Sequence, residues 1–196
     1  DGILSEAIAL HPGIRILRQD PWETLVSFII SACNNIPRIK KIIASLCELC
    51  AVPAVGGGYA FPSPEDIVLL GEEGLAPIRA GFRAKYILSA ARRIASGEVS
   101  LDEIGMMDTP DALSALCSFD GVGVKVASCV LLFGYGRAEV FPVDVWIKRV
   151  MEKYYPGGDW RELFGQHAGI AQQYLYVYER DAAKRFACPA DGKKAI

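Results

Sequence analysis

The sequence predicts an all-α protein of roughly nine or ten helices. Apolar residues recur three or four positions apart in several long stretches, which is the period of a helix and not the alternation of a strand. Proline opens four of these stretches, and glycine-rich or proline-rich loops separate them. Together these signals favour helices throughout.

The first helix starts are marked by proline. Proline suits the first turn of a helix because its missing N–H has no partner there, and a preceding Asp, Ser or Thr can cap the free donors. We therefore expect helices to begin at Asp20-Pro21, Ile36-Pro37, Ser63-Pro64 and Thr109-Pro110.

Further helices follow from periodicity alone. They are expected over 86–94, 126–133, 145–154 and 168–178. The clearest break is "YYPGGD" at 154–159. We expect an N-terminal segment, 1–19, that packs with a C-terminal helical lobe, 156–196, and a larger helical lobe over 20–155.

Composition excludes several classes of protein. The 196-residue chain has a formal net charge of −2 and 52% hydrophobic residues, as soluble globular proteins do. No apolar run approaches the roughly 20 residues of a membrane span, and no signal peptide is visible, so we expect no membrane role and a cytoplasmic location. The single CxxC, Cys47 to Cys50, lacks the second pair or histidines of a zinc site.

The stretch "FDGVGVKVASC", 119–129, predicts a tight turn between two helices. We expect a helix-hairpin-helix over 111–134, with Gly121, Val122 and Gly123 in the turn. Glycines allow a sharp turn and a close approach of its N–H groups to another surface, and the following helix start favours an anion. Such a hairpin binds a DNA backbone without reading sequence. The alternative is a helix corner whose glycines serve packing alone.

Lys125 lies in the first turn of the second helix, where the helix dipole disfavours a cation. The position is poor for stability, which suggests a chemical role. A lysine amine is a nucleophile that forms Schiff bases with sugar aldehydes, so a base-excising enzyme can use it to displace a base and cleave the strand.

Asp144, in "VFPVDVWI", opens another helix after Pro142. Its carboxylate can simply cap that helix. Beside a reactive lysine it has a second use, because its negative charge can stabilise positive charge on the deoxyribose or steer proton transfers.

Five motifs in order resemble the helix-hairpin-helix DNA glycosylase superfamily, and within it the 8-oxoguanine DNA glycosylase/lyases, of a bacterial type. They are "RILRQDPWETLVSFIISACNNIPRI", "AGFRAKYI", "FDGVGVKVASC", "VFPVDVWI" and "HAGIAQQYLY". The resemblance implies two helical lobes with an active-site cleft between them, and a bifunctional enzyme that excises 8-oxoguanine opposite cytosine and then cleaves the strand by β-elimination.

The resemblance also implies residue roles. Lys125 matches the Schiff-base nucleophile and Asp144 the catalytic aspartate. Gln172, Tyr176 and Cys129 match the pocket of the flipped base, which base excision requires. The other matches concern DNA outside that pocket: Arg38 and Arg83 at the opposite cytosine, Phe82 as an aromatic wedge, and Asn34 and Asn35 in the loop that fills the gap.

Three positions depart from the family pattern. Asp120 stands where the hairpin usually has proline. Cys33 replaces the gap-filling asparagine, so either Asn34 and Asn35 compensate or the preference for cytosine weakens. Trp146 replaces a histidine.

The resemblance bears on cofactors and partners as well. It implies no cofactor, apart from Na⁺ or K⁺ at the carbonyls of Cys117, Phe119 and Val122, and the sequence lacks the four cysteines of an iron–sulfur cluster. The expected partner is double-stranded DNA with a damaged base, bound by a monomer. We expect the β-rich domain that precedes this region in relatives to be missing.

Two other readings stay open. One is a glycosylase for another oxidised or alkylated base. The other is a non-catalytic DNA-binding module that uses the hairpin alone, although backbone binding requires neither Lys125 nor Asp144.

Overall fold

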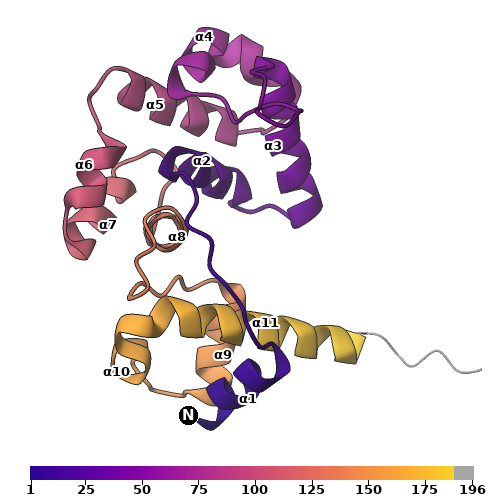
Figure 1. The fold of residues 1–196 in the computed structure, drawn as a ribbon, viewed down its shortest axis with the longest axis vertical. Coiled ribbons are helices and arrows are strands. Elements are labelled where there is room, and N and C mark those ends of the chain that lie inside the picture. The colour runs from indigo at the N-terminus through magenta and orange to yellow at the C-terminus, as the bar shows by residue number, and fades with distance from the viewer. Residues whose placement is uncertain (188–196) are drawn as a thin grey trace, which may run out of the picture. The chain divides into compact units, whose positions relative to one another are not determined.

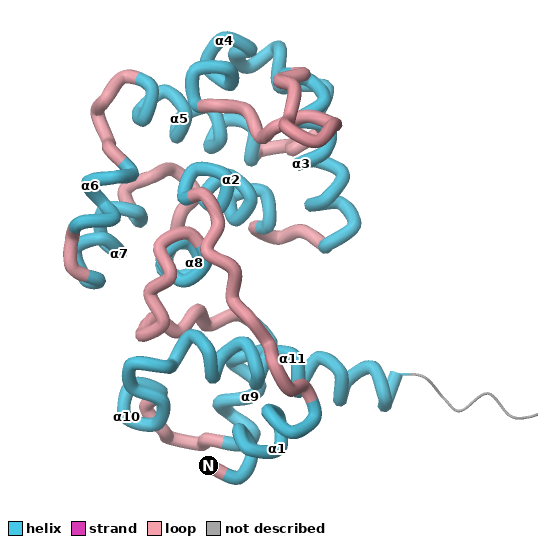
Figure 2. The backbone as a smooth tube through the Cα atoms, in the orientation of Figure 1, coloured by secondary structure: helices cyan, strands magenta, loops and turns pink. Residues whose placement is uncertain are grey.

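A computed structural model of the chain describes the backbone of residues 1–187 and the side chains of residues 1–182. Within these residues the protein is helical, with one isolated bridge between Pro53 and Tyr59 and no strand (Figures 1 and 2). The all-α prediction is confirmed. The last nine residues of the expected C-terminal lobe, 188–196, lie outside the described residues.

The described chain divides into two compact units, residues 17–137 and residues 1–16 with 138–187. The first unit contains α2 (Pro21–Ser31), α3 (Ile36–Cys50), α4 (Pro64–Leu75), η1 (Ala76–Ile78), α5 (Arg83–Ala95), α6 (Leu101–Met106), α7 (Thr109–Cys117) and α8 (Val124–Phe133). The second contains α1 (Gly2–Leu10), α9 (Val145–Tyr154), α10 (Trp160–Phe164), η2 (Gly165–His167) and α11 (Ala168–Ala187).

In the unit of residues 17–137, α8 is the most deeply buried helix. Its residues from Val126 to Leu132 are all buried, and it packs against α2 and α7. Because it is apolar after its first turn except at the buried Ser128, α8 is typical of a central core helix. Its N-terminus, which carries Lys125, is the end that reaches the surface, since Gly123 and Val124 are exposed.

The proline-marked helix starts are confirmed, with two differences in the capping residue. Asp20 and Ser63 cap their helices through side-chain oxygens, as expected. At α3 the cap is Asn35 instead of Ile36, and at α7 it is Asp108 instead of Thr109. Both differences have one cause: a polar side chain one position earlier reaches the free N–H groups, so the helix begins a residue sooner.

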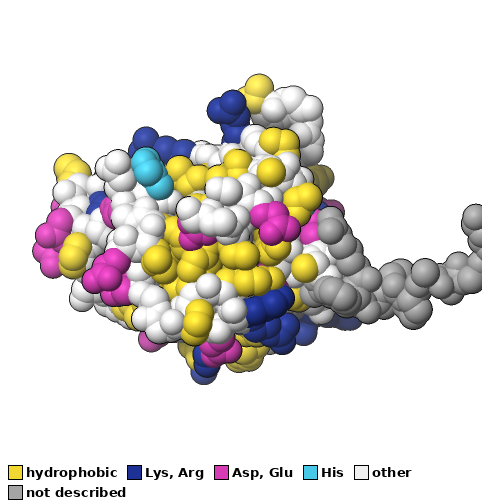
Figure 3. Space-filling model, turned by 90° about the horizontal axis from the view of Figure 1, so that it is seen from below, with side chains coloured by type: hydrophobic (Ala, Val, Ile, Leu, Met, Phe, Trp, Pro, Cys, Tyr) yellow, Lys and Arg dark blue, Asp and Glu magenta, His cyan; other side chains and the backbone are white. Residues whose placement is uncertain are grey.

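The second unit has its own small core. Phe141, Ile147, Val150, Ala168 and Leu175 are buried together, and aromatic side chains surround them. Phe141 stacks on both Trp160 and Phe164, at ring-centroid distances of 5.2 and 5.7 Å. Hydrophobic side chains also gather in the middle of the face of the molecule that Figure 3 shows.

The division between the units differs from the one expected from the sequence. The loop at 154–159 suggested a boundary near residue 155, whereas the structure places α9 with α11 and divides the chain at 137/138. The reason is that Ile147 and Val150 of α9 are buried against Ala168 and Leu175 of α11. The N-terminal segment 1–16 belongs to the same unit, where α1 contacts α11.

No helix in the described part of the chain is long and apolar enough to cross a membrane.

Candidate functional site

The glycine turn joins α7 to α8 as the sequence predicts. The Val122 N–H donates to the Phe119 carbonyl at 3.1 Å, and Gly121 has a φ of +76°, which favours glycine. Gly123 is the N-cap of α8, and none of the side chains described by the structure caps that end. The first N–H groups of α8 are therefore available to an outside acceptor.

The two glycines of the turn have different surroundings. A Cβ on Gly121 would lie within 3.0 Å of three ring carbons of Tyr86, whereas a Cβ on Gly123 would meet nothing within 4 Å. Gly121 is thus needed for close packing of the turn on α5. Gly123 leaves open space in front of the helix start.

We predict that Gly121→Ala destabilises the protein by about 1–3 kcal/mol, because it adds a methyl group where there is no room and where φ is positive. Gly123→Ala is the matched control, since its φ of −95° suits alanine and its surroundings are open. Chemical denaturation of both variants measures the difference. Equal stabilities would show that the packing against Tyr86 does not constrain the turn.

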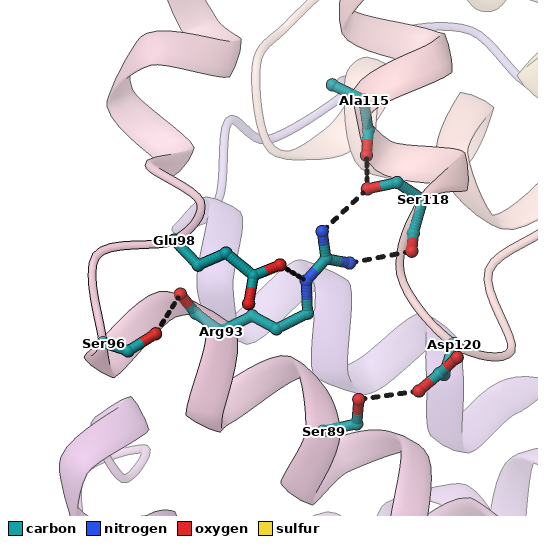
Figure 4. A network of polar contacts seen from close by, with 7 residues as sticks. All are labelled: Ser89, Arg93, Ser96, Glu98, Ala115, Ser118 and Asp120. Atoms are coloured by element: carbon teal, nitrogen blue, oxygen red, sulfur yellow. Dashed lines mark hydrogen bonds and ion pairs between the residues drawn. The ribbon is translucent and has the colours of Figure 1, made fainter.

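One face of α5 holds the turn through polar contacts, shown in Figure 4. The Ser89 hydroxyl donates to Asp120 Oδ2 at 2.7 Å. Arg93 donates from Nη1 to the Ser118 carbonyl at 2.7 Å, and its Nε pairs with Glu98 at 2.6 Å. Its guanidinium also lies 4.9 Å from the Phe119 ring centroid. The hydrogen bond from Ser89 gives Asp120, which stands in place of a proline, a role in fixing the turn.

Lys125 follows the turn directly, in the first turn of α8. It is half-buried, and its Nζ lies 5.1 Å from the ring centroid of Phe28 on α2, in cation–π range. No ion pair to Lys125 is present among the residues whose side chains are described. The Lys125 amine is therefore held in place by an aromatic ring and not by a carboxylate among these residues.

Asp144 begins α9 in the other unit. Its Oδ1 accepts the Ile147 N–H at 2.8 Å, so the capping role anticipated from the sequence is present. This hydrogen bond occupies one carboxylate oxygen. Within the described part of the chain Oδ2 accepts no hydrogen bond, so Asp144 can cap the helix and still present a charge elsewhere.

Gln172 and Tyr176 lie one turn apart on α11, on the same face. Gln172 is buried, and its Nε2 donates to the Pro142 carbonyl at 3.1 Å, two residues before Asp144. The Tyr176 ring is half-buried, with the Arg180 guanidinium 5.4 Å from its centroid. The structure therefore brings Gln172 close to the segment that carries Asp144.

Cys129 is buried in α8, one helical turn after Lys125 on the same face. The expected site residues thus fall into two sets. Lys125 and Cys129 belong to the unit of residues 17–137, and Asp144, Gln172 and Tyr176 belong to the other unit.

The loop from α2 to α3 is held by its asparagines. Asn34 Nδ2 donates to the Ile30 carbonyl at 3.0 Å, and Asn35 Oδ1 accepts the Arg38 N–H at 3.0 Å. Cys33 is exposed and has a φ of 49°. Arg38 is exposed, and its Nη2 donates to the Arg79 carbonyl at 3.3 Å.

Arg83 is buried, with 3% of its surface exposed, and it joins two loops. Its Nε donates to the Ala32 carbonyl at 2.7 Å and its Nη2 to the Ala32 and Cys33 carbonyls. Its Nη1 donates to the Ala80 carbonyl at 3.2 Å. These hydrogen bonds use four of the five N–H groups of the guanidinium and leave one for another acceptor.

Phe82, just before Arg83, is 52% exposed. Its ring packs edge-on against Tyr86 at 5.9 Å and under the Arg83 guanidinium at 4.4 Å. An aromatic ring that is half exposed and fixed from two sides is suited to insertion between flat groups.

The cysteines of the CxxC pair show no sign of a metal site. Burial raises the pKa of the Cys47 and Cys50 thiols, which disfavours the thiolate that a metal requires. No group of three His, Cys, Asp or Glu lies close enough to hold a metal ion among the described residues.

Sequence reasoning missed the face of α5 that supports the hairpin turn. Tyr86, Ser89 and Arg93 stand three and four residues apart, which places them on one face of the helix. That spacing could have identified a shared helix face from the sequence alone. Their target, the turn at 118–121, was not visible from the sequence.

Comparisons with known proteins show the family of the chain. A model of the family "HhH-GPD superfamily base excision DNA repair protein" matches residues 26–164. The chain is 31% identical to a protein of Methanothermobacter thermautotrophicus named "Probable N-glycosylase/DNA lyase", over 92% of this chain and 68% of that protein.

Two solved structures are similar in fold. One is MBOgg1 in complex with a low-affinity DNA ligand, at a TM-score of 0.88 and 45% identity, over 93% of this chain and 68% of that one. The other is the 8-oxoguanine glycosylase/lyase of Clostridium acetobutylicum with double-stranded DNA containing cytosine opposite 8-oxoG. Its TM-score is 0.84 and its identity 39%, over 93% of this chain and 67% of that one. The chain thus spans about two thirds of the length of each relative.

Proposed function

Since the chain belongs to the HhH-GPD superfamily of base excision DNA repair proteins, we propose that it is a DNA glycosylase with lyase activity. It removes 8-oxoguanine opposite cytosine and then cleaves the strand at the abasic site. One observation carries the proposal: Lys125 stands at the start of α8, directly after a glycine turn, with its amine on an aromatic ring and no carboxylate partner among the described side chains. The solved relatives with this fold include a glycosylase/lyase bound to such DNA.

The hairpin positions the DNA backbone. A phosphate accepts hydrogen bonds from the N–H groups of Gly121 and Gly123, on either side of Val122, whose own N–H donates to the Phe119 carbonyl. The dipole of α8 favours the negative charge of the phosphate. Gly123 has open space in front of it, which a phosphate needs. Lys125 is then within one helical turn of a bound phosphate, and so close to a deoxyribose.

Lys125 supplies the nucleophile. After loss of a proton its amine attacks C1′ of the deoxyribose, and the bond from C1′ to the damaged base breaks, with the base leaving as the anion or taking up a proton. Ring opening gives a Schiff base between Nζ and C1′. Loss of a proton from C2′ then expels the 3′ phosphate, which is the β-elimination that cleaves the strand.

Asp144 stabilises the positive charge that develops on the deoxyribose as the base leaves. Its Oδ1 is held by the start of α9, which fixes the carboxylate, and its Oδ2 is available for this role.

The substitution Asp144→Asn keeps the helix cap and removes the negative charge, so it tests the two roles of this side chain separately. Asparagine caps helices as well as aspartate does, so we expect the free energy of unfolding to change by less than about 0.5 kcal/mol. The rate of base excision should fall by roughly 100-fold, because the negative charge is removed. Single-turnover excision and thermal melting measure the two effects. Asp144→Asn with wild-type excision would assign this residue to capping alone.

The excised base would be held by Gln172, Tyr176 and Cys129. An extruded base needs hydrogen bonds to its edge and stacking on its faces. The Gln172 amide has a fixed orientation for the purine edge, because its Nε2 donates to the Pro142 carbonyl and its Oε1 accepts from Gln173 Nε2 at 2.6 Å. Tyr176 offers a ring face and Cys129 a small apolar side chain.

The DNA strand opposite the lesion would be contacted at the loop before α3 and the loop before α5, which Arg83 joins. Phe82 is exposed enough to fill the gap beside the extruded base. Arg38 offers the outer edge of its guanidinium to the cytosine, and Arg83 reaches this strand through its one remaining N–H group. Asn34 and Asn35 shape the loop between α2 and α3. On this proposal Arg83 acts mainly by positioning the loops.

We propose that no organic cofactor takes part. The carbonyls of Cys117 and Val122 accept no hydrogen bond in the described part of the chain, and that of Phe119 accepts one. Carbonyl oxygens with spare lone pairs at one turn suit Na⁺ or K⁺, which would stiffen the turn when bound. The substrate places the protein on DNA, in the cytoplasm of a bacterial cell, where we propose it acts as a monomer.

The proposal is tested with a panel of labelled duplexes that carry 8-oxoguanine opposite cytosine, 8-oxoguanine opposite adenine, 3-methyladenine, or no lesion. We expect excision and strand cleavage to be fastest on the first duplex. Preference for the alkylated base would assign a different substrate. DNA binding without excision of any base would show that the protein is a non-catalytic DNA-binding module.

A further inference from the structure

A cavity lined by positive side chains lies on the unit of residues 17–137, where α3 meets η1. Its volume is about 560 Å³, and its lining residues are Arg38, Lys41, Ser45, Pro77, Ile78 and Arg79. Three of these residues are cations and none is acidic. No ion pair to any of the three is present within the part of the chain whose side chains are described.

Local structure explains how the cations meet. Arg38 and Lys41 are three residues apart on α3, so they share one face of the helix. Arg79 has a left-handed backbone, with φ 53° and ψ 37°, which is rare for a residue other than glycine. Its N–H donates to the Ala76 carbonyl at 3.1 Å, and its own carbonyl accepts from Arg38 at 3.3 Å. The backbone therefore holds Arg79 beside Arg38 despite their equal charge.

Such a cavity favours an anion with several oxygens. A hollow lined by one sign of charge concentrates counter-ions, because the low-dielectric walls focus the field. The planar fork of arginine matches the oxygens of a phosphate, and the Ser45 hydroxyl is a further donor. Arg38, Lys41 and Arg79 are all exposed, so an extended ligand can reach them.

The position of the cavity identifies the ligand. Arg83 joins the loop before α3 to the loop before α5 through the carbonyls of Ala32, Cys33 and Ala80. The arginines proposed to contact the cytosine, Arg38 and Arg83, lie directly after these two loops, in the first turns of α3 and α5. Arg38 also belongs to the cavity wall. Lys41 lies about 4.5 Å further along α3. Successive phosphates of a DNA strand are about 3.4 Å apart along the helix axis.

We infer that this cavity binds a backbone phosphate of the strand that carries the cytosine, next to the cytosine nucleotide. The inference rests on the proposed function, since that function supplies the duplex and the place of the cytosine. It adds a second anchor on DNA to the hairpin, on the opposite strand. It also assigns a role to Lys41 and Arg79, which the reaction itself does not use.

Salt dependence of binding tests the site. The full chain is titrated with a duplex that carries an uncleavable abasic analogue opposite cytosine, over a range of salt concentrations. For Lys41→Gln combined with Arg79→Gln, we expect the slope of log Kd against log salt to fall by about 0.9 for each phosphate that the protein no longer neutralises. Lys40→Gln is the matched control, because Lys40 is exposed, adjacent in sequence and absent from the cavity wall. A double variant with the slope of Lys40→Gln would overturn the inference.

Uncharged methylphosphonates then identify the strand. Placed on both sides of the cytosine nucleotide, they should weaken wild-type binding by about tenfold and the double variant by less than about twofold. An equal loss of affinity in both proteins would place the phosphate elsewhere and refute the inference. Wild-type excision on the 8-oxoguanine duplex is measured in parallel. If excision is absent while the slopes change as expected, the proposed function fails and the phosphate site stands.

Discussion

Lys125→Gln is expected to reduce base excision and strand cleavage by roughly 10³-fold or more, because the amine is the only nucleophile in the proposed reaction. Binding to the uncleavable duplex should stay within about threefold of wild type, since the hairpin binds DNA through backbone N–H groups. Removal of the cation–π interaction with Phe28 costs at most about 1 kcal/mol of stability. Gel analysis of the cleaved strand and a binding titration measure the two properties.

Lys148→Gln is the control for this variant. Lys148 is exposed on α9 and lies 4.0 Å from Glu152, so its removal should change neither cleavage nor binding. If Lys125→Gln retained wild-type cleavage, the nucleophile would have to be another group. If binding and cleavage disappeared together, Lys125 would bind the DNA backbone instead.

Arg83→Ala is expected to have the largest effect on stability, a loss of about 3 kcal/mol. The side chain is buried and makes four hydrogen bonds to three carbonyls on two loops. Alanine removes these bonds, leaves the carbonyls without a donor, and leaves a cavity. For a chain of this length we expect Tm to fall by roughly 10 °C.

Arg38→Ala is the matched control, because Arg38 is exposed and its side chain makes one long hydrogen bond, to the Arg79 carbonyl, within the described residues. Its Tm should stay within about 2 °C of wild type, while its discrimination between opposite bases should fall. Arg83→Ala with an unchanged Tm and a selective loss of cytosine preference would contradict the positioning role and make Arg83 a direct ligand of the cytosine.

Local signals explain why much of the fold was predictable. Proline in the first helical turn and a capping side chain act within a few residues, so the starts of α2, α4 and α7 could be inferred from the sequence. The division into two units could not be inferred from such local signals. It depends on Ile147 and Val150 packing against residues of α11, which are far from them in the chain.

The candidate site shows the same limit. The glycine turn and Lys125 are adjacent in sequence, so their pattern predicts a helix start with a reactive amine. The burial of Arg83 was not predictable, because an arginine in a basic stretch usually faces solvent and its carbonyl partners lie some 50 residues away. The left-handed Arg79 was hidden for a similar reason, since its conformation depends on a turn and on Arg38.

The measurement that tests the central claim most directly is borohydride trapping. Borohydride reduces a lysine Schiff base to a permanent crosslink, so the chain and its Lys125→Gln variant are each mixed with two duplexes, one carrying 8-oxoguanine opposite cytosine and one carrying an abasic site. We expect wild type to crosslink to both duplexes and Lys125→Gln to neither. A crosslink that persists in Lys125→Gln, or no crosslink of wild type to either duplex, would contradict excision through this amine.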